Sequence, residues 1–480
     1  MATLRSALAR LRPTALDRDI ARLAVPALGA LIAEPLFLLT DTALVGHLGA
    51  SPLAGLGIAS AILQTIVGLM VFLAYATTPA VARRLGAGDV PGAIRAGLDG
   101  MWLSVVLGAV LLAIGLPLAD SVVGIFGADA AVSTAASTYL SISLWGIPAM
   151  LLVLATTGLL RGLQDTRTPL VVAGVGFAVN AGLNAVFIYG FGWGIAGSAA
   201  GTVVAQWGMA AVYLVIAVRA ARAQSISLRP GLSGVRGAAF SGGWLLLRTA
   251  SLRAAILVTT FVATAAGTTE LATIQIGMTL FFTLAFVLDS LAIAGQALIG
   301  HGLGAANVTR VRAVTRRLTA LGVGFGVVLG LLIAALSPVL GGLFTSDAAI
   351  LTALPGLFVV MAVGVPIAGF VFVLDGVLIG AGDARYLALT GLVNLAIYLP
   401  ILWAVGVLAG GGGGGDGGGA DGGVAVGGGA VGGGAVGGGA SVSVAVVLLW
   451  AAFGIGYIGA RALTLGLRAR SDRWIVTGAG

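Results

Sequence analysis

The sequence contains no cysteine and no lysine, and only 9% of its 480 residues are charged. The lack of cysteine excludes disulfide bonds, zinc–thiolate sites and catalysis by a thiol. The two histidines, His47 and His301, are too few and too far apart in the sequence to indicate a metal centre. Soluble domains carry roughly 25% charged residues, whereas 59% of this chain is hydrophobic. The composition therefore excludes a soluble enzyme, a nucleic-acid-binding protein and a disordered scaffold, and it indicates an integral membrane protein.

Twelve stretches are long and apolar enough for a membrane-spanning helix, which needs about 20 residues. No ten-residue alternation of apolar and polar residues is present, and a bilayer accepts only helices or closed barrels. The sequence therefore predicts an all-α membrane protein. Its twelve spans cover approximately residues 20–46, 54–79, 96–118, 135–159, 169–190, 196–218, 240–265, 272–298, 318–341, 350–377, 386–408 and 442–466.

The distribution of arginine predicts the orientation of these spans. Arginines outside the spans lie in the N-terminal arm (residues 1–19), in the loops after even-numbered spans and in the C-terminal tail. The loops after odd-numbered spans contain none. Because positively charged loops stay in the cytoplasm, we expect a multi-pass protein of the cell membrane with both termini cytoplasmic.

The two halves of the chain are related by an internal repeat with an offset of 218 residues. Each half has six spans, so both halves have the same orientation, and an axis along the membrane normal is expected to relate them, with a cleft between. The prediction is an N-lobe (residues 20–230) and a C-lobe (residues 231–480), which is typical of transporters. The repeat is carried by Gly158-x-x-x-Gly162-x-x-Asp165-x-Arg167, which returns as Gly376-x-x-x-Gly380-x-x-Asp383-x-Arg385, and by residues 85–89, which return as 303–307.

A glycine-dominated insert, residues 409–441, separates the last two spans. Glycine-rich chain behaves as flexible coil. We therefore expect a disordered extracellular loop within the C-lobe.

Polar residues inside the spans mark candidate functional positions, because a carboxylate in the middle of a bilayer is costly. Asp41 lies about five residues from the outer end of span 1, and Asn184 and Thr202 lie at a similar depth in spans 5 and 6. Asn180 precedes Asn184 by one turn on the same helix face. Taken alone, each amide is better explained by a hydrogen bond between helices, and Thr202 by a hydrogen bond to a carbonyl of its own helix. Their common depth with Asp41 favours a shared site. Since carboxylate, amide and hydroxyl oxygens suit hard cations, we predict a site for a proton or a sodium ion.

Four further polar residues are secondary candidates for a proton path or a substrate contact. Glu34 either extends the path from Asp41 or satisfies the carbonyl freed by a neighbouring proline. Asp289 and Gln296 lie on span 8, and Asp375 lies near the cytoplasmic end of span 10, where Arg385 is a possible partner.

The second half of the chain does not repeat the predicted cation site. At the offset of 218 residues, Asp41 becomes Thr259 and Asn180 becomes Tyr398. The C-lobe instead has Arg248 and Arg253 early in span 7, placed either to pair with an acid or to meet an anionic substrate. The cation site is therefore expected in the N-lobe alone.

Two prolines interrupt the hydrogen-bond ladder of span 1, at Pro26 and Pro35. A proline removes one backbone donor and kinks a helix. One reading is that this span bends when Asp41 changes its charge; the other is a fixed kink, since proline kinks are also common in spans without any motion.

The stretches from Asp17 to Pro26 and from Glu34 to Gly49, together with the two repeated signatures, resemble the multidrug and toxic compound extrusion (MATE) family, specifically its DinF-like branch. The resemblance covers approximately residues 17–474. It implies a two-lobed exporter that moves organic compounds outward in exchange for protons or sodium ions. It also implies that Asp41, Asn180, Asn184 and Thr202 form the N-lobe cation site.

The sequence therefore predicts a proton-coupled (or sodium-coupled) antiporter for small organic compounds of amphipathic or cationic character; the apolar composition of the spans suits amphipathic compounds. It is expected to act as a monomer in contact with lipid, without a cofactor and without enzymatic activity. The alternatives are a flippase for a lipid-linked sugar or another amphipathic lipid, a membrane enzyme acting on lipids, and a channel.

Overall fold

The computed structural model describes residues 15–410 and 438–478. Within these residues, twelve helical stretches are long and apolar enough to cross a membrane, which confirms the predicted all-α fold with twelve spans. Several spans consist of two or three consecutive helical elements, which differ in the type of helical turn or, like α3 and α4, are separated by a single residue. The elements are α2 (Ala15–Gly46), α3 (Ala50–Met70), α4 (Phe72–Gly86), α5 (Val90–Gly124), α6 (Ala130–Ser143), η1 (Leu144–Gly146), α7 (Ile147–Gly162), α8 (Arg167–Ala185), η2 (Val186–Gly190), α9 (Gly194–Ala223), α10 (Leu232–Ala266), α11 (Thr268–Gly304), α12 (Val308–Leu340), η3 (Gly341–Leu343), α13 (Ala348–Gly380), α14 (Ala384–Gly410), α15 (Gly438–Ala451), η5 (Ala452–Tyr457), α16 (Ile458–Arg470) and η6 (Asp472–Trp474).

Two predicted segments fall partly outside the described residues. Of the N-terminal arm, residues 1–14 lie outside, and the first span already begins at Ala15. Of the glycine-rich insert, residues 411–437 lie outside, while its edges continue α14 to Gly410 and begin α15 at Gly438. The helices therefore extend beyond the apolar windows from which the spans were predicted.

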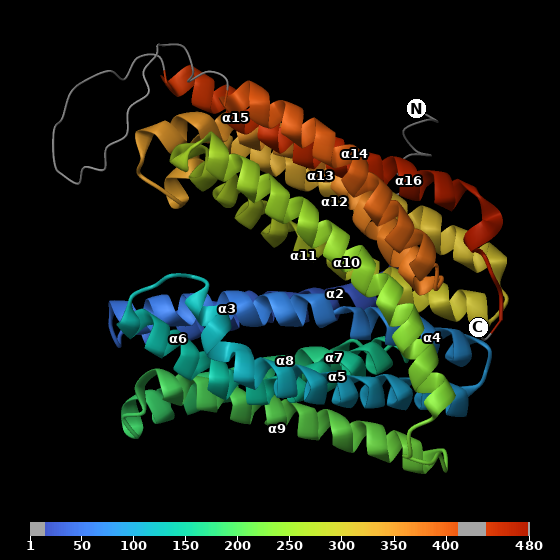
Figure 1. The fold of residues 1–480 in the computed structure, drawn as a ribbon. Coiled ribbons are helices and arrows are strands. Elements are labelled where there is room, and N and C mark those ends of the chain that lie inside the picture. Colours follow the sequence, from blue (N-terminus) through green and yellow to red (C-terminus); the bar gives the residue numbers. More distant parts are fainter. Residues whose placement is uncertain (1–14, 411–437, 479–480) are drawn as a thin grey trace.

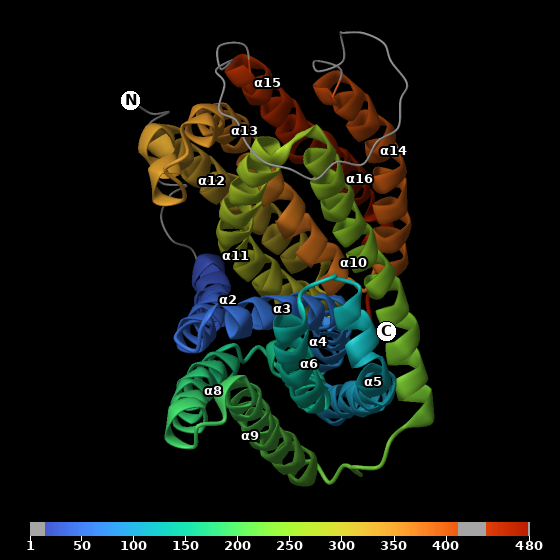
Figure 2. The same cartoon turned by 60° about the vertical axis from the view of Figure 1, so that its left-hand side comes forward.

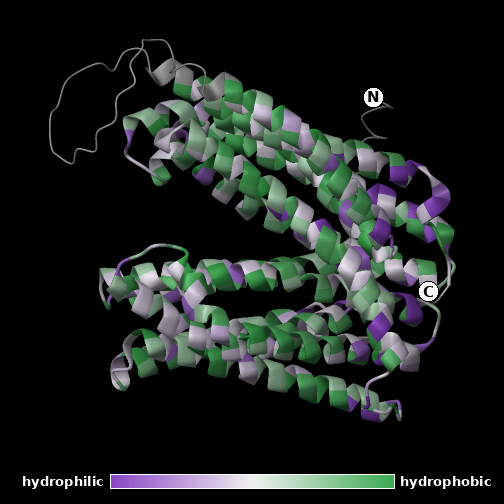
Figure 3. Cartoon of the chain, viewed as in Figure 1, coloured by the Kyte–Doolittle hydropathy of each residue, from purple (hydrophilic) through white to green (hydrophobic). Residues whose placement is uncertain are grey.

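The helices form two bundles, with α2–α9 in one and α10–α16 in the other (Figure 1). The bundles meet near the C-terminus and their helices diverge toward the opposite end (Figures 1 and 2). Hydrophobic residues cover both bundles, whereas hydrophilic residues are denser near the C-terminus (Figure 3). We call this end, which carries the arginine-containing loops, the arginine-rich end.

The repeated loops at the arginine-rich end have the same backbone conformation in both lobes. Gly88 has φ = 81° and its repeat partner Ala306 has φ = 53°. Each is followed by a helix cap: the side chain of Asp89 accepts a hydrogen bond from the Gly92 N–H at 2.8 Å, and that of Asn307 accepts one from the Arg310 N–H at 3.0 Å. The repeat in the sequence is therefore a repeat of turn geometry and capping.

The first glycine of each repeated signature allows two helices to pack with their backbones in contact. A Cβ on Gly158 would lie 2.8 Å from the carbonyl oxygen of Ala74 on α4. A Cβ on Gly376 would lie 2.5 Å from the carbonyl oxygen of Ala292 on α11, which is the repeat partner of Ala74. The signatures thus hold α7 on α4 and α13 on α11 in the same manner.

Polar contacts join the two lobes at the arginine-rich end. Arg317 on α12 pairs with Asp17 on α2 at 2.5 Å, and the neighbouring Arg310 pairs with Asp19 at 3.1 Å. The chain after η6 also lies across this junction, where Arg83 on α4 donates a hydrogen bond to the carbonyl of Val476.

Candidate functional site

Asp41 lies near the end of α2 opposite to the arginine-rich end, and only 4% of its surface is exposed. The helix that carries it is continuous from Ala15 to Gly46 although it contains Pro26 and Pro35. Pro26 has no N–H to donate to the carbonyl of Arg22 four residues earlier. The hydroxyl of Thr166 donates to that carbonyl at 3.5 Å, so the gap in the ladder is partly filled from the loop before α8.

Three side chains from three other helices donate hydrogen bonds to the Asp41 carboxylate. Asn184 Nδ2 on α8 lies 2.8 Å from Oδ1, and Ser198 Oγ on α9 lies 2.5 Å from the same oxygen. Tyr139 Oη on α6 lies 3.1 Å from Oδ2. Hydrogen bonds to a charged acceptor are shorter and stronger than neutral ones, so this arrangement stabilises a buried negative charge.

The remaining predicted residues belong to the same network. Asn180 Oδ1 accepts a hydrogen bond from Asn184 Nδ2 at 3.3 Å, and Asn180 Nδ2 donates to Thr202 Oγ1 at 3.0 Å. All three side chains are buried. The structure thus brings Asp41, Asn180, Asn184 and Thr202 together, and we call these four residues with Tyr139 and Ser198 the N-lobe site.

Sequence reasoning missed Tyr139 and Ser198. Ser198 precedes Thr202 by one helical turn and therefore shares its face of α9, which is a signal that could have identified it. Tyr139 has no such signal, because α6 contributes no acid to the site and hydroxyl side chains are common in apolar helices. Only the packing of α6 against α3 and α9 places the Tyr139 hydroxyl on Asp41.

One oxygen of the N-lobe site lacks a hydrogen-bond donor. Asn184 Oδ1 is buried and has no partner among the described residues. It faces Gly201 on α9, where a Cβ would collide with it. Unpaired buried oxygens are rare. Asn184 Oδ1, Asn180 Oδ1 and the Asp41 carboxylate are the kind of oxygen atoms that bind a proton or a hard cation.

The equivalent position of the C-lobe contains a neutral pair. The hydroxyls of Thr259 and Tyr398, which are the repeat partners of Asp41 and Asn180, lie 2.6 Å apart and are buried. A hydroxyl pair satisfies itself without a charge. At this position of the repeat, therefore, only the N-lobe has an acid.

The secondary candidates lie apart from the N-lobe site. The side chain of Glu34 is exposed and Asp289 is half-buried, and neither forms a hydrogen bond or an ion pair among the described residues. Gln296 is buried in the C-lobe. Its backbone carbonyl oxygen lies 2.7 Å from the position that a Cβ on Gly380 would take. The side-chain oxygen Oε1 of Gln296 is buried and has no hydrogen-bond partner among the described residues.

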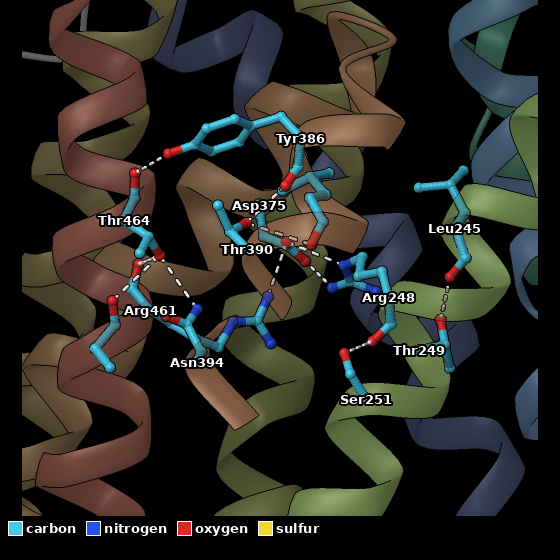
Figure 4. Close-up of polar contacts among 12 residues, drawn as sticks. Leu245, Arg248, Thr249, Ser251, Asp375, Tyr386, Thr390, Asn394, Arg461 and Thr464 are labelled. Atoms are coloured by element: carbon cyan, nitrogen blue, oxygen red, sulfur yellow. Dashed lines mark hydrogen bonds and ion pairs between the residues drawn. The ribbon is translucent and has the colours of Figure 1, made fainter. Parts of the chain in front are cut away.

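Asp375 corrects one expectation. Its carboxylate binds Arg248 on α10 and Arg461 on α16 (Figure 4) and not Arg385, whose guanidinium lies 5.8 Å from the ring centroid of Trp244. The expectation failed because the Arg385 side chain, in the first turn of α14, lies over Trp244 of α10, while α10 and α16 bring buried arginines to Asp375. Arg248 does pair with an acid, which is one of the two alternatives that the sequence left open for it.

Comparisons with known proteins agree with this architecture. The family model MatE matches residues 26–186 and 252–403. The probable multidrug resistance protein NorM of Rhizobium meliloti is 30% identical over 406 residues, which cover 80% of this chain and 84% of the relative. Protein DETOXIFICATION 45, chloroplastic, of Arabidopsis thaliana is 29% identical over 80% of this chain and 72% of its own length. The crystal structure of the Vibrio cholerae MATE transporter VcmN in the bent form has the same fold, with a TM-score of 0.80 at 21% identity over 96% of this chain and 98% of that one.

Proposed function

The chain belongs to the MATE family of membrane transporters, and on this premise we propose that it is an antiporter coupled to protons, with sodium as the alternative ion at the same site. It is a multi-pass transporter of small organic compounds and not an enzyme. The alternative of a lipid flippase has no support in the comparisons.

The observation that carries the proposal is the single buried acid of the N-lobe site. A charge in the interior of a membrane protein is costly and marks ion or proton pathways. Asp41 is 4% exposed and receives three hydrogen bonds from α6, α8 and α9. Because the C-lobe has the neutral Thr259–Tyr398 pair at the equivalent position, ion binding acts on one lobe.

Ion binding at Asp41 weakens the attachment of α2 to its neighbours. A proton or a cation cancels the charge that Asn184, Ser198 and Tyr139 stabilise, and hydrogen bonds to a neutral acceptor are weaker. Pro26 and Pro35 leave α2 with missing backbone hydrogen bonds, so this helix bends at lower cost than an uninterrupted one. The description of the VcmN structure as a bent form supports the idea that this fold has more than one helix conformation.

The arginine distribution supports an orientation in the cell membrane with both termini and the arginine-rich end in the cytoplasm. In this orientation the lobes meet on the inside and diverge toward the outside, and Asp41 lies close to the outer surface. Ions entering from outside reach Asp41 first, and cargo leaves between the lobes. Each chain contains both lobes and the ion site, so a monomer surrounded by lipid suffices for transport.

Transport by purified protein in liposomes tests this proposal. Proton and sodium gradients are applied separately, and a panel of cationic, neutral and anionic compounds is offered under each gradient. We expect accumulation of at least one compound against its gradient when the proton gradient is applied. Movement only down the gradient of the compound would indicate a channel, and accumulation driven by sodium alone would assign the site to that ion.

A further inference from the structure

The segment that joins the two lobes, residues 224–231 between α9 and α10, is bound to α5 of the N-lobe. Arg95 Nη1 donates a hydrogen bond to the carbonyl of Ser227 at 2.9 Å, and Trp102 Nε1 donates one to the carbonyl of Leu228 at 2.9 Å. Arg95 and Trp102 are seven residues apart, so they lie on one face of α5. The joining segment is therefore attached to the N-lobe.

The start of α10 is held by the same face of α5. Asp99 lies between Arg95 and Trp102 on this face and is buried, and its Oδ1 accepts a hydrogen bond from the Gly231 N–H at 3.2 Å. A Cβ on Gly234 would collide with Asp99 Oδ2. The carboxylate thus lies against the first turn of α10, where a negative charge is favourable. The first helix of the C-lobe therefore begins in contact with the N-lobe.

Along α10, the contacts change from one lobe to the other between Gly242 and Trp244. A Cβ on Gly242 would lie 2.5 Å from Cε2 of Phe72 on α4, in the N-lobe. The Trp244 ring instead meets the C-lobe, where the Arg385 guanidinium lies 5.8 Å from its centroid. One turn later, Arg248 is bound within the C-lobe (Figure 4). Figures 1 and 2 show α10 passing from one bundle to the other.

Two contacts with the N-lobe lie beyond this point, and both are made by the ends of arginine side chains. Arg248 Cζ lies 5.9 Å from the ring centroid of Tyr75 on α4. Arg253 Nη2 lies 2.8 Å from the position that a Cβ on Gly68 of α3 would take. Long side chains with many rotamers follow a displacement, so these contacts hold the backbone of α10 less firmly than those of its first turns.

The point at which the contacts change has a sequence that bends easily. Ser241, Gly242 and Gly243 are consecutive, and helices kink at glycine and serine pairs because glycine tolerates many backbone conformations. Close packing explains Gly242, which lies on Phe72, but it does not explain Gly243. Gly243 is exposed, and a Cβ there would meet nothing within 4 Å.

We propose that α10 bends at residues 241–243 when the lobes move relative to each other, while the joining segment and the first turns of α10 stay with the N-lobe. This inference rests on the proposed transport between the lobes and names the place at which the chain bends. The alternative is a hinge in the joining segment itself, which would have to release the contacts with Arg95, Asp99 and Trp102.

Hydrogen–deuterium exchange of the purified full-length protein, followed by mass spectrometry, tests the proposal without cargo. Fraying alone makes exchange decrease steadily from the start of a helix inward. A bend predicts a local maximum, so the amides of residues 243–247 should exchange about fivefold faster than those of residues 237–241 and 251–255. Gly243→Ala should remove the maximum. A steady decrease along α10, or a maximum that persists in Gly243→Ala, would overturn the proposal.

The matched control is Gly237→Ala, because Gly237 is also exposed on α10 and a Cβ there also meets nothing within 4 Å. This variant should keep the maximum at residues 243–247, and neither variant should lower the unfolding midpoint. A maximum that Gly237→Ala removes as well would contradict a bend confined to residues 241–243.

Ethidium transport in liposomes tests the consequence for function. A stiffer α10 raises the cost of bending, so Gly243→Ala should transport ethidium about fivefold more slowly than the wild-type protein, and Gly237→Ala should match the wild-type rate. Equal rates for the two variants would contradict a role of the bend in transport. Absence of ethidium transport by the wild-type protein would bear on the proposed function alone, because the exchange pattern still decides where α10 bends.

Discussion

Gly86 on α4 and Gly304 on α11 contact the opposite lobe in the same way. A Cβ on Gly86 would collide with the carbonyl oxygen of His301, and a Cβ on Gly304 would collide with that of Arg83. His301 is the repeat partner of Arg83, and Gly304 is that of Gly86. The two lobes therefore close the arginine-rich end through a pair of symmetric backbone contacts.

Replacing Gly86 by alanine should separate α4 from α11, because the added methyl group meets a backbone atom that cannot rotate away. Overpacking of this kind costs about 1–3 kcal/mol, which corresponds to a decrease of about 1–3 °C in the thermal unfolding midpoint of a chain of this length. The control is Gly57→Ala, since a Cβ at Gly57 meets nothing within 4 Å and alanine favours a helix. Equal midpoints for the two variants would argue against a tight contact at Gly86.

The ion pair between Asp17 and Arg317 should favour the arrangement in which the lobes meet at the arginine-rich end. Asp17→Asn removes that pair, so we expect a second population in which the opposite ends of the lobes are closer. Spin labels on Ile125→Cys and Leu343→Cys, both exposed, report this distance without background because the chain has no other cysteine. The control is Asp472→Asn, which breaks the pair with Arg312 inside the C-lobe and should leave the distance distribution unchanged. A distribution unaffected by Asp17→Asn would show that this pair has no influence on lobe position.

Removing one donor from the Asp41 carboxylate should impair ion-coupled transport without unfolding the protein. Tyr139→Phe and Ser198→Ala each delete a hydroxyl that bonds to Asp41. A hydrogen bond to a charged group contributes about 1.5–3 kcal/mol, so we expect rates to decrease roughly tenfold or more. Transport in liposomes measures the effect. Thr138→Val is the control, because the Thr138 hydroxyl bonds only within its own helix; a similar loss in that variant would mean that the effect is not specific to the site.

The hydroxyl pair of the C-lobe should contribute to stability and not to ion coupling. Tyr398→Phe removes its hydrogen bond to Thr259, at an expected cost of about 1 kcal/mol. We therefore expect a decrease of about 1 °C in the unfolding midpoint, with the dependence of transport on the ion gradient unchanged. Loss of that dependence in Tyr398→Phe would place part of the coupling in the C-lobe.

Much of the fold was predictable because the bilayer restricts it. The length of the apolar stretches predicts the spans, and the repeated loops predict how the lobes are related. Gly88 and Ala306 both have positive φ, so the repeat in the sequence is also a repeat of backbone conformation. Helix ends such as Ala15 were missed, since apolar windows stop where a helix leaves the hydrocarbon.

The candidate site was predictable only as far as depth and helix face determine it. Asp41, Asn180, Asn184 and Thr202 share a depth, and the structure places them in one network. Tyr139 and the partners of Asp375 depend on how neighbouring helices rotate about their axes. That rotation is set by close packing at many positions, and the apolar pattern of a single span contains little information about it.

The most direct test of the central claim is transport by Asp41→Asn protein in liposomes with an imposed proton gradient. Asparagine has nearly the shape of aspartate but holds no charge and takes up no proton, so the protein should keep the wild-type unfolding midpoint within a few degrees. We expect gradient-driven accumulation of a compound that the wild-type protein transports to decrease to the level of protein-free liposomes. Accumulation at the wild-type rate and with the wild-type dependence on the proton gradient would contradict the role of Asp41 in coupling.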